Sequence, residues 1–345
     1  MGKVLLMAAL ALVLSSCSRA PAPVLNPADW SAFKARFIRA DGRVVDDAKG
    51  GRTHSEGQGY GMLFAVAFDD RATFERIWRW TQKHLQVRDD YLFAWLWDDQ
   101  EGRVIDTNNA TDADLIIGWA LMRAARHWSA QEYRLAASRI FDSLASLRIR
   151  VNGRLFLLPA AKGFYDADKL VLNPSHFVLP AYRELAEVDT HLDWHALYVD
   201  ALALLKASRW GEWQLPPDWL DLRQGGRPWK KRPPYFSYDA IRIPLFAAWA
   251  GETELLQPYL ELWAPFSMRV RQPDIVDLET GFVHLRQGFH AVDAIRRLCQ
   301  HAAKGDAEPG GFRWDKHASY YSASLYLLSQ MAWNELDLNR GSEGR

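Results

Sequence analysis

The apolar residues of this chain recur, from Trp30 onward, at the spacing of amphipathic α-helices, and this pattern limits the folds that it can adopt. The segment "DADLIIGWALMRAARHW" at 112–128 places apolar residues at offsets 0, 3, 4, 7 and 11, which share one helix face: Ile117, Ala120, Leu121, Ala124 and Trp128. Similar windows occupy 60–68, 71–84, 131–147, 176–187, 193–206, 238–249, 252–263, 288–301 and 320–333. The sequence therefore predicts roughly ten helices.

Pro- and Gly-rich turns separate these windows, as in "QLPPDWLDLRQGGRP" and "KGDAEPGGFRWDK". Strand signals are few and occur around Leu155, in "GRLFLLPA", and in "DIVDLETGFVHL". No shift in composition marks a domain boundary. An α-solenoid of stacked helix pairs stays open as an alternative, but the pairs show no clear sequence repeat. A single all-α domain that closes on itself is the preferred interpretation.

The first 17 residues, "MGKVLLMAALALVLSSC", indicate an export signal that is not part of the fold. Lys3 gives it a positive start, and the apolar stretch at 4–14 is too short for a stable membrane span. The residues before Cys17 resemble the lipobox of bacterial lipoproteins, in which the peptide is cut before a Cys that is then lipidated. An ordinary cleaved signal with a chance Cys is the alternative. The resemblance implies a periplasmic protein anchored by its lipid, and Ser18, rather than Asp, favours the outer membrane.

The remaining chain divides into three parts. We expect a tether at 18–28, one folded domain at 29–336 and a polar tail at 337–345. Cys299 has no disulfide partner once Cys17 is acylated, so we expect Cys299 to be a small buried apolar residue in a large core.

Charge and aromatic content narrow the class of partner. Lys plus Arg and Asp plus Glu both number 42, so no net field attracts nucleic acid or an anionic membrane. The 16 Trp, 12 Tyr and 16 Phe are unusually many, and we expect some of these rings to line a surface groove.

Three carboxylates occupy predicted helix starts: Glu56 in "RTHSEGQGYGM", Asp112 in "NNATDADLIIGWAL" and Asp239 in "PPYFSYDAIRIPL". Each position suits a capping role, because free N–H groups and the macrodipole favour a carboxylate there. Ser55-x-x-Gln58 has the form of a capping box, and Thr111-x-x-Asp114 resembles one. A cap is therefore the simplest interpretation of each carboxylate taken singly.

The glycines after Glu56 argue for more than a cap. Gly57, Gly59 and Gly61 each destabilise a helix interior by roughly 1 kcal/mol relative to Ala. We expect them to let a group such as a sugar ring approach the backbone closely. The spacing lacks the G-x-G-x-x-G form of nucleotide sites, the zinc spacing H-E-x-x-H is missing, and no G-x-S-x-G elbow occurs.

Hydrolysis of a glycosidic bond needs two carboxyls, one protonated and one ionised. An acid at Glu56 requires burial or a nearby carboxylate to raise its pKa by more than the helix dipole lowers it. Asp112 or Asp239 could supply that like charge. The hypothesis from the residues alone is thus a two-carboxylate site of which Glu56 is the acid.

The same segments resemble glycoside hydrolase family 8. Residues 110–128, "ATDADLIIGWALMRAARHW", are similar to its signature, and "SEGQGYGM", "SYDAIRIP", "NPSHF" and "SYYSASLYLLS" match further landmarks in order between about 29 and 335. The chain departs from the family at Gly118, where Ala is preferred, and at His176, where Tyr is usual. Within the family the closest likeness is to the periplasmic endoglucanase encoded with bacterial cellulose synthase.

The resemblance implies an all-α (α/α)6 barrel, a six-hairpin toroid, and an inverting β-1,4-glycanase. It implies Glu56 as general acid, Asp239 as general base and Asp112 as the group that binds and distorts the sugar. The implied substrate-binding residues are Trp97, Tyr238, Arg242, Tyr320, Tyr321 and Asn173, with Arg242 orienting Asp239 and Asn173 either structural or a distant sugar contact. Of Trp95 and Trp97, one is expected to stack on sugar and the other to pack inward. The resemblance implies no metal and no cofactor.

The expected activity is that of an endo-acting β-1,4-glucanase whose partner is a β-1,4-glucan chain, with the cellulose synthase complex as a further expected partner. Xylanase, chitosanase and mixed-linkage glucanase are the enzymatic alternatives. A lipoprotein that binds or guides a glucan chain without cutting it is the alternative from a different class.

Overall fold

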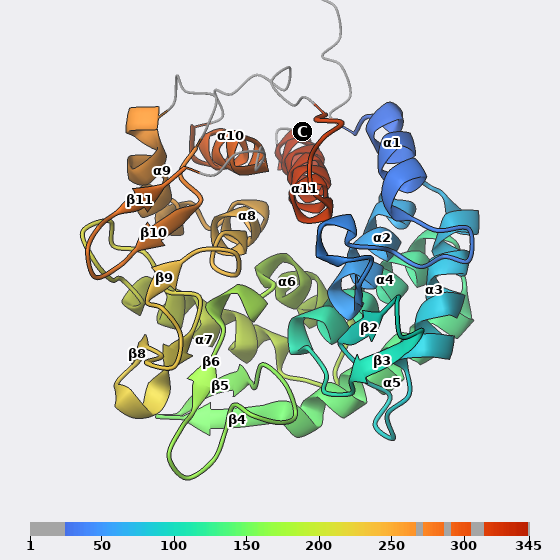
Figure 1. Cartoon of the computed structure of the whole chain (residues 1–345), viewed down its shortest axis with the longest axis horizontal. Helices are drawn as coiled ribbons and strands as arrows, with labels where there is room; N and C mark the ends of the chain where they lie inside the picture. Colours follow the sequence, from blue (N-terminus) through green and yellow to red (C-terminus); the bar gives the residue numbers. More distant parts are fainter. Residues whose placement is uncertain (1–24, 267–271, 286–290, 305–313, 344–345) are drawn as a thin grey trace, which may run out of the picture.

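The computed structural model describes residues 25–266, 272–285, 291–304 and 314–343. Helices dominate this part of the chain (Figure 1): α1 Pro27–Phe37, α2 Ser55–Ala67, α3 Arg71–Leu85, α4 Thr111–His127, α5 Gln131–Leu144, α6 Leu179–Val188, α7 Trp194–Ala207, α8 Arg242–Trp249, α9 Gln257–Trp263, α10 Ala291–Lys304 and α11 Tyr320–Glu343. Short 3-10 helices add single turns: η1 Asp47–Lys49, η2 Ala145–Leu147, η3 Pro174–His176, η4 Leu222–Gln224, η5 Thr253–Leu255 and η6 Ala264–Phe266.

Five of the helices form a closed ring. Helix α2 packs on α4, α4 on α6, α6 on α8 and α8 on α11, and α11 returns to α2 (Figure 1). Helices α3, α5, α7 and α10 pack as partners of neighbouring ring helices. The closure excludes an open solenoid and confirms the predicted all-α domain that closes on itself, and an inner ring with outer partner helices is the layout expected of an (α/α)6 barrel.

Burial separates the ring from the helices outside it. Every residue of α8 is buried, and most residues of α2 and α4 are buried too, because these helices are surrounded by other helices. By contrast, α3 and α5 bury only one face. This difference follows from the apolar pattern, since a helix that is apolar all round must be enclosed.

The strands are short and are grouped in four small antiparallel sheets. The sheets are β1-β2-β3 (Thr53–His54, Leu96–Asp98, Arg103–Asp106), β4-β5 (Arg148–Val151, Arg154–Leu157), β6-β7-β8 (Val171–Leu172, Leu220–Asp221, Arg227–Pro228) and β9-β10-β11 (Tyr235–Phe236, Ile275–Asp277, Val283–His284). The expected strands around Leu155 and in 274–285 are confirmed as β5 and as β10 with β11.

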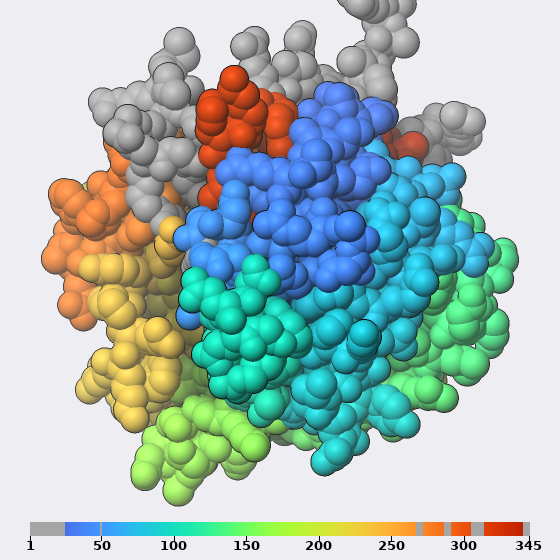
Figure 2. All heavy atoms as spheres, turned by 45° about the vertical axis from the view of Figure 1, so that its right-hand side comes forward, coloured from blue at the N-terminus to red at the C-terminus, as the bar shows by residue number. Residues whose placement is uncertain are grey.

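Strands from two of these sheets stand shortly before ring helices in the sequence. Strand β1 precedes α2, the β2-β3 hairpin precedes α4, and β9 precedes α8. Figure 2 shows the β2-β3 segment, in teal, at the surface beside the blue N-terminal quarter of the chain. The sheets therefore border the end of the barrel at which the ring helices begin.

The glycines of α2 serve protein packing, which corrects the expectation of a sugar contact. A Cβ added at Gly57 would lie 2.6 Å from the Tyr320 hydroxyl oxygen of α11, and one at Gly59 would lie 2.8 Å from Ile116 Cγ2 of α4. At Gly61 the nearest side-chain atoms, of Ile77 and Val44, lie at 3.0 Å. The glycines thus allow α2 to pack closely against α11, α4 and α3.

Some sequence predictions concern the chain ends. The signal at 1–17 with Cys17, and the tether as far as residue 24, lie outside the described residues. Within them, α1 begins at Pro27 and α11 continues to Glu343. Cys299 is fully buried, as expected, and burial raises the pKa of its thiol. Among the described helices, none combines the length and apolar character that a membrane crossing requires.

Candidate active site

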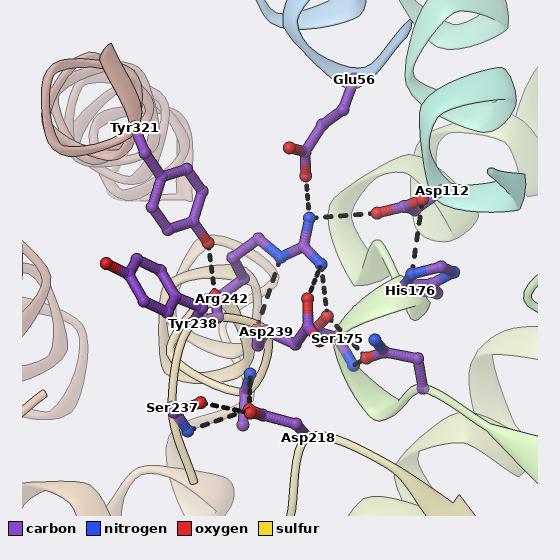
Figure 3. A network of polar contacts seen from close by, with 12 residues as sticks. Glu56, Asp112, Ser175, His176, Asp218, Ser237, Tyr238, Asp239, Arg242 and Tyr321 are labelled. Carbon is purple, nitrogen blue, oxygen red and sulfur yellow. Dashed lines mark hydrogen bonds and ion pairs between the residues drawn. The ribbon is translucent and has the colours of Figure 1, made fainter. Parts of the chain in front are cut away.

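The three predicted carboxylates converge on one buried guanidinium, that of Arg242 at the start of α8 (Figure 3). Its Nη1 donates to Glu56 Oε1 and, over 3.0 Å, to Asp112 Oδ2. Its Nη2 donates to Ser175 Oγ over 2.6 Å and to Asp239 Oδ1 over 3.4 Å. Side chains that are far apart in the sequence therefore form one polar network.

The direction of the ring helices explains this convergence. Glu56 and Asp112 are the second residues of α2 and α4, Ser175 lies shortly before α6, and Asp239 lies three residues before Arg242. The N-terminal ends of four ring helices consequently meet at one place. Their partial positive charge favours carboxylates there, which makes a cluster with more anions than cations tolerable.

The carboxylates do not act as helix caps, so both capping-box predictions are wrong. The N-cap positions of α2 and α4 are His54 and Ala110, and neither residue makes a side-chain capping bond. Gln58 accepts instead from Val44 N over 2.6 Å, and the Asp114 carboxylate accepts from Phe93 N over 2.9 Å. The side chains that a capping box would use are thus hydrogen-bonded to backbone groups of other segments.

Glu56 extends from α2 into the network. Tyr60, one turn further along the helix, donates its hydroxyl to Glu56 Oε1 over 2.9 Å. Arg242 contacts the same oxygen. Strand β1 fixes the start of the helix, because the next backbone N–H, that of Ser55, donates to Trp95 O over 3.1 Å. The start of α2 is thus held by the bond of Ser55 to Trp95, and the Glu56 side chain is held by Tyr60 of the same helix.

Asp112 is almost completely buried between two cationic or potentially cationic groups. Arg242 lies on one side, and His176 Nε2 lies 3.5 Å from the other carboxylate oxygen, Oδ1. Burial lowers the pKa of the His176 imidazole, and the charge of Asp112 partly opposes that shift. His176, one of the two positions at which this chain departs from the family pattern, therefore lies inside the site.

The surroundings of Asp239 raise the pKa of its carboxyl and so make it a weaker acid than usual. Burial raises its pKa to about 7, and the charges of Asp218 and Asp112 act in the same direction, while Asn173 and Trp219 favour the ionised form. The side chain is 34% exposed by surface area, but its carboxyl is surrounded by other polar groups of the network. A carboxyl with a pKa near 7 can exchange a proton with water at neutral pH.

Asn173 is a structural residue of the site. It is buried and caps η3, where its Oδ1 accepts from Ser175 N over 3.0 Å and from Ser175 Oγ over 2.7 Å. Its Nδ2 faces Asp239 closely enough to lower the pKa of that carboxyl, although it does not reach full hydrogen-bond geometry. Of the two roles expected for Asn173, the structure supports the structural one.

The predicted tyrosines lie in different environments. Tyr238 is 52% exposed, and Tyr321 donates its hydroxyl to Tyr238 O over 2.6 Å, so these two rings border the site. Tyr320, in contrast, is 3% exposed and packs against Phe33 and Phe37. The expectation that Tyr320 contacts substrate is corrected, since its ring belongs to the core between α1 and α11.

The two tryptophans near β2 also differ. Trp97 packs edge-on against Trp80 and His84 of α3, with ring centres 5.4 and 5.0 Å away. Trp95 stacks on His54, two residues before Glu56. A register shift between Leu96 and Trp97 allows the two side chains to diverge. Trp97 is thus partly buried against α3, and Trp95 lies beside His54 near the site; which of the two rings stacks on sugar stays a prediction.

Sequence reasoning missed two members of the network. Ser175 holds Arg242, and Asp218 accepts hydrogen bonds from Ser237 N over 2.9 Å and from Ala240 N over 2.8 Å. Ser175 lies within the "NPSHF" landmark, which gave a signal, whereas Asp218 lies in a Pro-rich turn that looked like a connection only. Among the described residues, no group of three or more His, Cys, Asp or Glu side chains is placed to hold a metal ion.

Comparisons with known proteins agree with this geometry. The family model for Glycosyl hydrolases family 8 matches residues 2–335. An endoglucanase from Cellulomonas uda is 41% identical over 260 residues, which are 74% of this chain and 72% of the relative. A probable endoglucanase from Novacetimonas hansenii is 36% identical over 323 residues, 90% of this chain and 92% of the relative.

A solved structure is similar over nearly the same extent. The GH8 endo-β-1,4-glucanase from an Achatina fulica gut metagenomic library has a TM-score of 0.81 and 40% sequence identity, and the match covers 89% of this chain and 97% of that one. The family match, the relatives and the closed helical barrel lead to one conclusion. This chain belongs to glycoside hydrolase family 8 and is a glycoside hydrolase.

Proposed function

We propose that this chain is an inverting endo-β-1,4-glucanase that hydrolyses internal bonds of cellulose or of soluble β-glucan. The observation that carries the proposal is the convergence of Glu56, Asp112 and Asp239 around Arg242. The relatives named endoglucanase, at 36 to 41% identity, support the substrate class.

Asp239 is the general base. Because its pKa is about 7, the carboxylate can accept a proton from a water molecule near neutral pH. That water then attacks the anomeric carbon on the face opposite the leaving oxygen. Inversion needs space for the water between the two carboxyls, roughly 6.5–9.5 Å in enzymes of this kind. The Arg242 guanidinium stands between Glu56 and Asp239, and so keeps the two carboxyls apart (Figure 3).

Glu56 is the general acid that protonates the leaving oxygen. Tyr60 and Arg242 both contact Oε1, so the proton has to be carried on Oε2. Asp112 lies between Arg242 and His176 and is the carboxylate that binds the sugar at the cleavage point. Exposed or half-exposed rings beside the site, such as Tyr238 and Trp95, supply apolar faces for pyranose rings.

The setting of the activity is also part of the proposal. We infer that the enzyme trims cellulose during its synthesis and export, with the cellulose synthase complex as a partner. The lipobox-like segment ending in Cys17 supports a periplasmic lipoprotein. A Cys17→Ala variant is then expected to move from the membrane fraction to the soluble periplasmic fraction, and an unchanged distribution would contradict the anchor.

The activity is tested by the loss of viscosity of carboxymethylcellulose and by NMR of the products from cello-oligosaccharides. Wild type is expected to lower viscosity quickly and to release the α-anomer first, since the substrate bond is β and inversion reverses it. Glu56→Gln should be inactive, while Glu187→Gln, a matched change on the exposed surface of α6, should retain full activity.

Three outcomes would contradict parts of the proposal. An initial β-anomer would exclude inversion. Full activity of Glu56→Gln would remove Glu56 from its role. A wild type that binds β-glucan without cutting it would favour a glucan-binding lipoprotein, and faster cleavage of xylan, chitosan or mixed-linkage glucan would assign one of the other family specificities.

A further inference from the structure

Asp218 is a second buried carboxylate behind Asp239 that the mechanism above does not use. Its Oδ1 accepts from Ser237 N over 2.9 Å and from Ala240 N over 2.8 Å, and its Oδ2 accepts from the Ser237 hydroxyl (Figure 3). The two donor residues flank Asp239 in the sequence, since Ser237 precedes it and Ala240 follows it. One side chain thus holds the turn from which the general base projects.

Further hydrogen bonds hold the same turn. Residues 238–241 form a turn between β9 and α8, closed by the bond from Ile241 N to Ser237 O over 2.9 Å. Tyr321 adds the bond to Tyr238 O. Asp218 is itself fixed, because its backbone N–H donates to Tyr235 O over 2.8 Å. It therefore ties the base-bearing turn to the loop before β7.

Asp218 also faces Asp239 as a like charge. Burial raises the pKa of Asp218, while the hydrogen bonds from Ser237 and Ala240 favour its ionised form. Of two adjacent carboxyls, the one that accepts more hydrogen bonds ionises first, and its charge then opposes ionisation of the other. Asp218 accepts three such bonds, so Asp239 is the member of the pair that keeps its proton longer.

We propose that Asp218 is a positioning residue of this glycosidase, which holds the turn carrying Asp239 and, through its negative charge, sets the pH above which Asp239 acts as a base. This inference rests on the proposed function, because it takes Asp239 as the base. The other titratable groups that act on Asp239 are Asp112 on α4, Arg242 on α8, Tyr321 on α11 and Tyr60 on α2. These groups are the same in the variants below.

Two variants separate the charge of Asp218 from its hydrogen bonds. Asp218→Asn keeps an oxygen that accepts from Ser237 N and Ala240 N, and its amide can donate to the Ser237 hydroxyl, so it removes mainly the charge. Ser237→Ala removes one hydrogen bond and leaves the charge. The readout is kcat/KM against pH on a soluble cello-oligosaccharide, with the unfolding temperature of each variant measured in parallel.

For Asp218→Asn, the acid-side limb of the profile should move to lower pH by about one unit, because a base without a neighbouring anion stays ionised at lower pH. For Ser237→Ala, the limb should stay in place while kcat falls by about tenfold, with KM little changed. If the acid-side limb of the Asp218→Asn profile coincides with that of wild type, the charge of Asp218 does not set the pH dependence, and that part of the proposal is overturned. A wild-type kcat in Ser237→Ala overturns the holding role.

Asp239→Asn distinguishes failure of the inference from failure of the proposed function. An active Asp239→Asn would show that Asp239 is not the base, and the proposed mechanism would fail. An inactive Asp239→Asn together with an unmoved limb in Asp218→Asn would refute only the role of Asp218. Should Asp218→Asn not fold, the kcat of Ser237→Ala decides the proposal by the criterion already given.

Discussion

The two ends of the ring of helices each hold a buried arginine, but the partners of these arginines differ. At the N-terminal ends of the helices, Arg242 faces the carboxyls of Glu56, Asp112 and Asp239. Further along α4, Arg123 pairs with Glu184 over 2.7 Å and with Glu335 over 2.6 Å. The first cluster has more anions than cations, and the second is balanced.

The balance around Arg123 is completed by uncharged donors. Trp119 donates to Glu184 Oε2 over 2.8 Å, and Trp249 donates to Glu335 Oε2 over 2.7 Å. Arg126 adds a second cation at Glu184. Although burial opposes it, the charge and hydrogen bonds of Arg123 hold the pKa of Glu184 below its usual value. The basic and acidic groups here are paired in equal number, which suits a structural role.

The surplus of carboxyls around Arg242 has the opposite consequence. A single guanidinium cannot keep four carboxyls ionised, counting Asp218 behind Asp239, so at least one of them has a raised pKa. Carboxyls with unequal protonation are what acid and base catalysis at neutral pH requires. The comparison teaches that unbalanced buried charge marks the reactive end, and balanced buried charge marks the supporting end.

The largest expected effect is the loss of activity when Glu56 is changed to Gln. The variant keeps a side chain of the same size but cannot donate the proton, and general acid catalysis contributes about 10²- to 10⁴-fold. We expect kcat on cello-oligosaccharides to fall by about 10³-fold, with an unfolding temperature close to that of wild type. A large loss of stability would instead mean that the N-terminal end of the ring also supports the fold, and the contrast between the two ends would not hold.

At the other end, Arg123→Met should act on stability and not on chemistry. Removing one partner of a buried pair leaves uncompensated charges and costs about 3–5 kcal/mol of unfolding free energy. Denaturant titration measures this, while kcat of the folded fraction should match wild type. Arg126→Met is the control, because its side chain is 64% exposed although it pairs with the same Glu184, and it should cost less than about 1 kcal/mol.

A smaller effect is expected where the reactive end depends on close helix packing. Gly59→Ala would place a Cβ 2.8 Å from Ile116 Cγ2, so α2 and α4 would have to separate slightly. Such overpacking costs about 1–3 kcal/mol. Thermal unfolding measures the loss, and kcat should fall as well because Glu56 and Asp112 are carried by these two helices. Unchanged stability would mean that Ile116 can move aside without strain.

The sequence predicted the helical barrel well because the ring and its partner helices are long and periodic. The windows at 71–84 and 193–206 coincide with α3 and α7 to within one residue at each end. The two-residue strands β1, β6, β7, β8 and β9 were missed, since a period of two cannot be recognised over two residues. The window at 238–249 was placed too early, because α8 begins only at Arg242.

For the site, the sequence identified the residues but not their connections. Glu56, Asp112 and Asp239 were found through their setting at helix starts and through family motifs, and the structure brings them together. Asp218 gave no signal, because its role depends on a contact with Ser237 across 19 residues. Pattern reasoning also misplaced Tyr320, since exposure of a single ring at the start of a helix is decided by tertiary packing.

The smallest expected effect, and the sharpest test of the comparison, is the response to pH. Because the pKa of Asp239 is about 7 and its ionised form is the proposed base, kcat/KM should fall as pH is lowered through 7, to about a tenth of its plateau at pH 6. The folded state binds this proton more readily than the unfolded chain does. Taken alone, Asp239 therefore makes the free energy of unfolding rise as pH is lowered over the same interval.

The supporting end should respond only at much lower pH. The pKa of Glu184 is lowered in the folded state, so its contribution to stability is present above its ordinary value of 4.5 and is lost as pH falls below that. Activity and unfolding temperature, measured together from pH 8 to pH 4, should therefore separate, with activity lost while the protein is still fully folded. A joint loss of both near pH 7 would show that the two ends of the barrel are not independent.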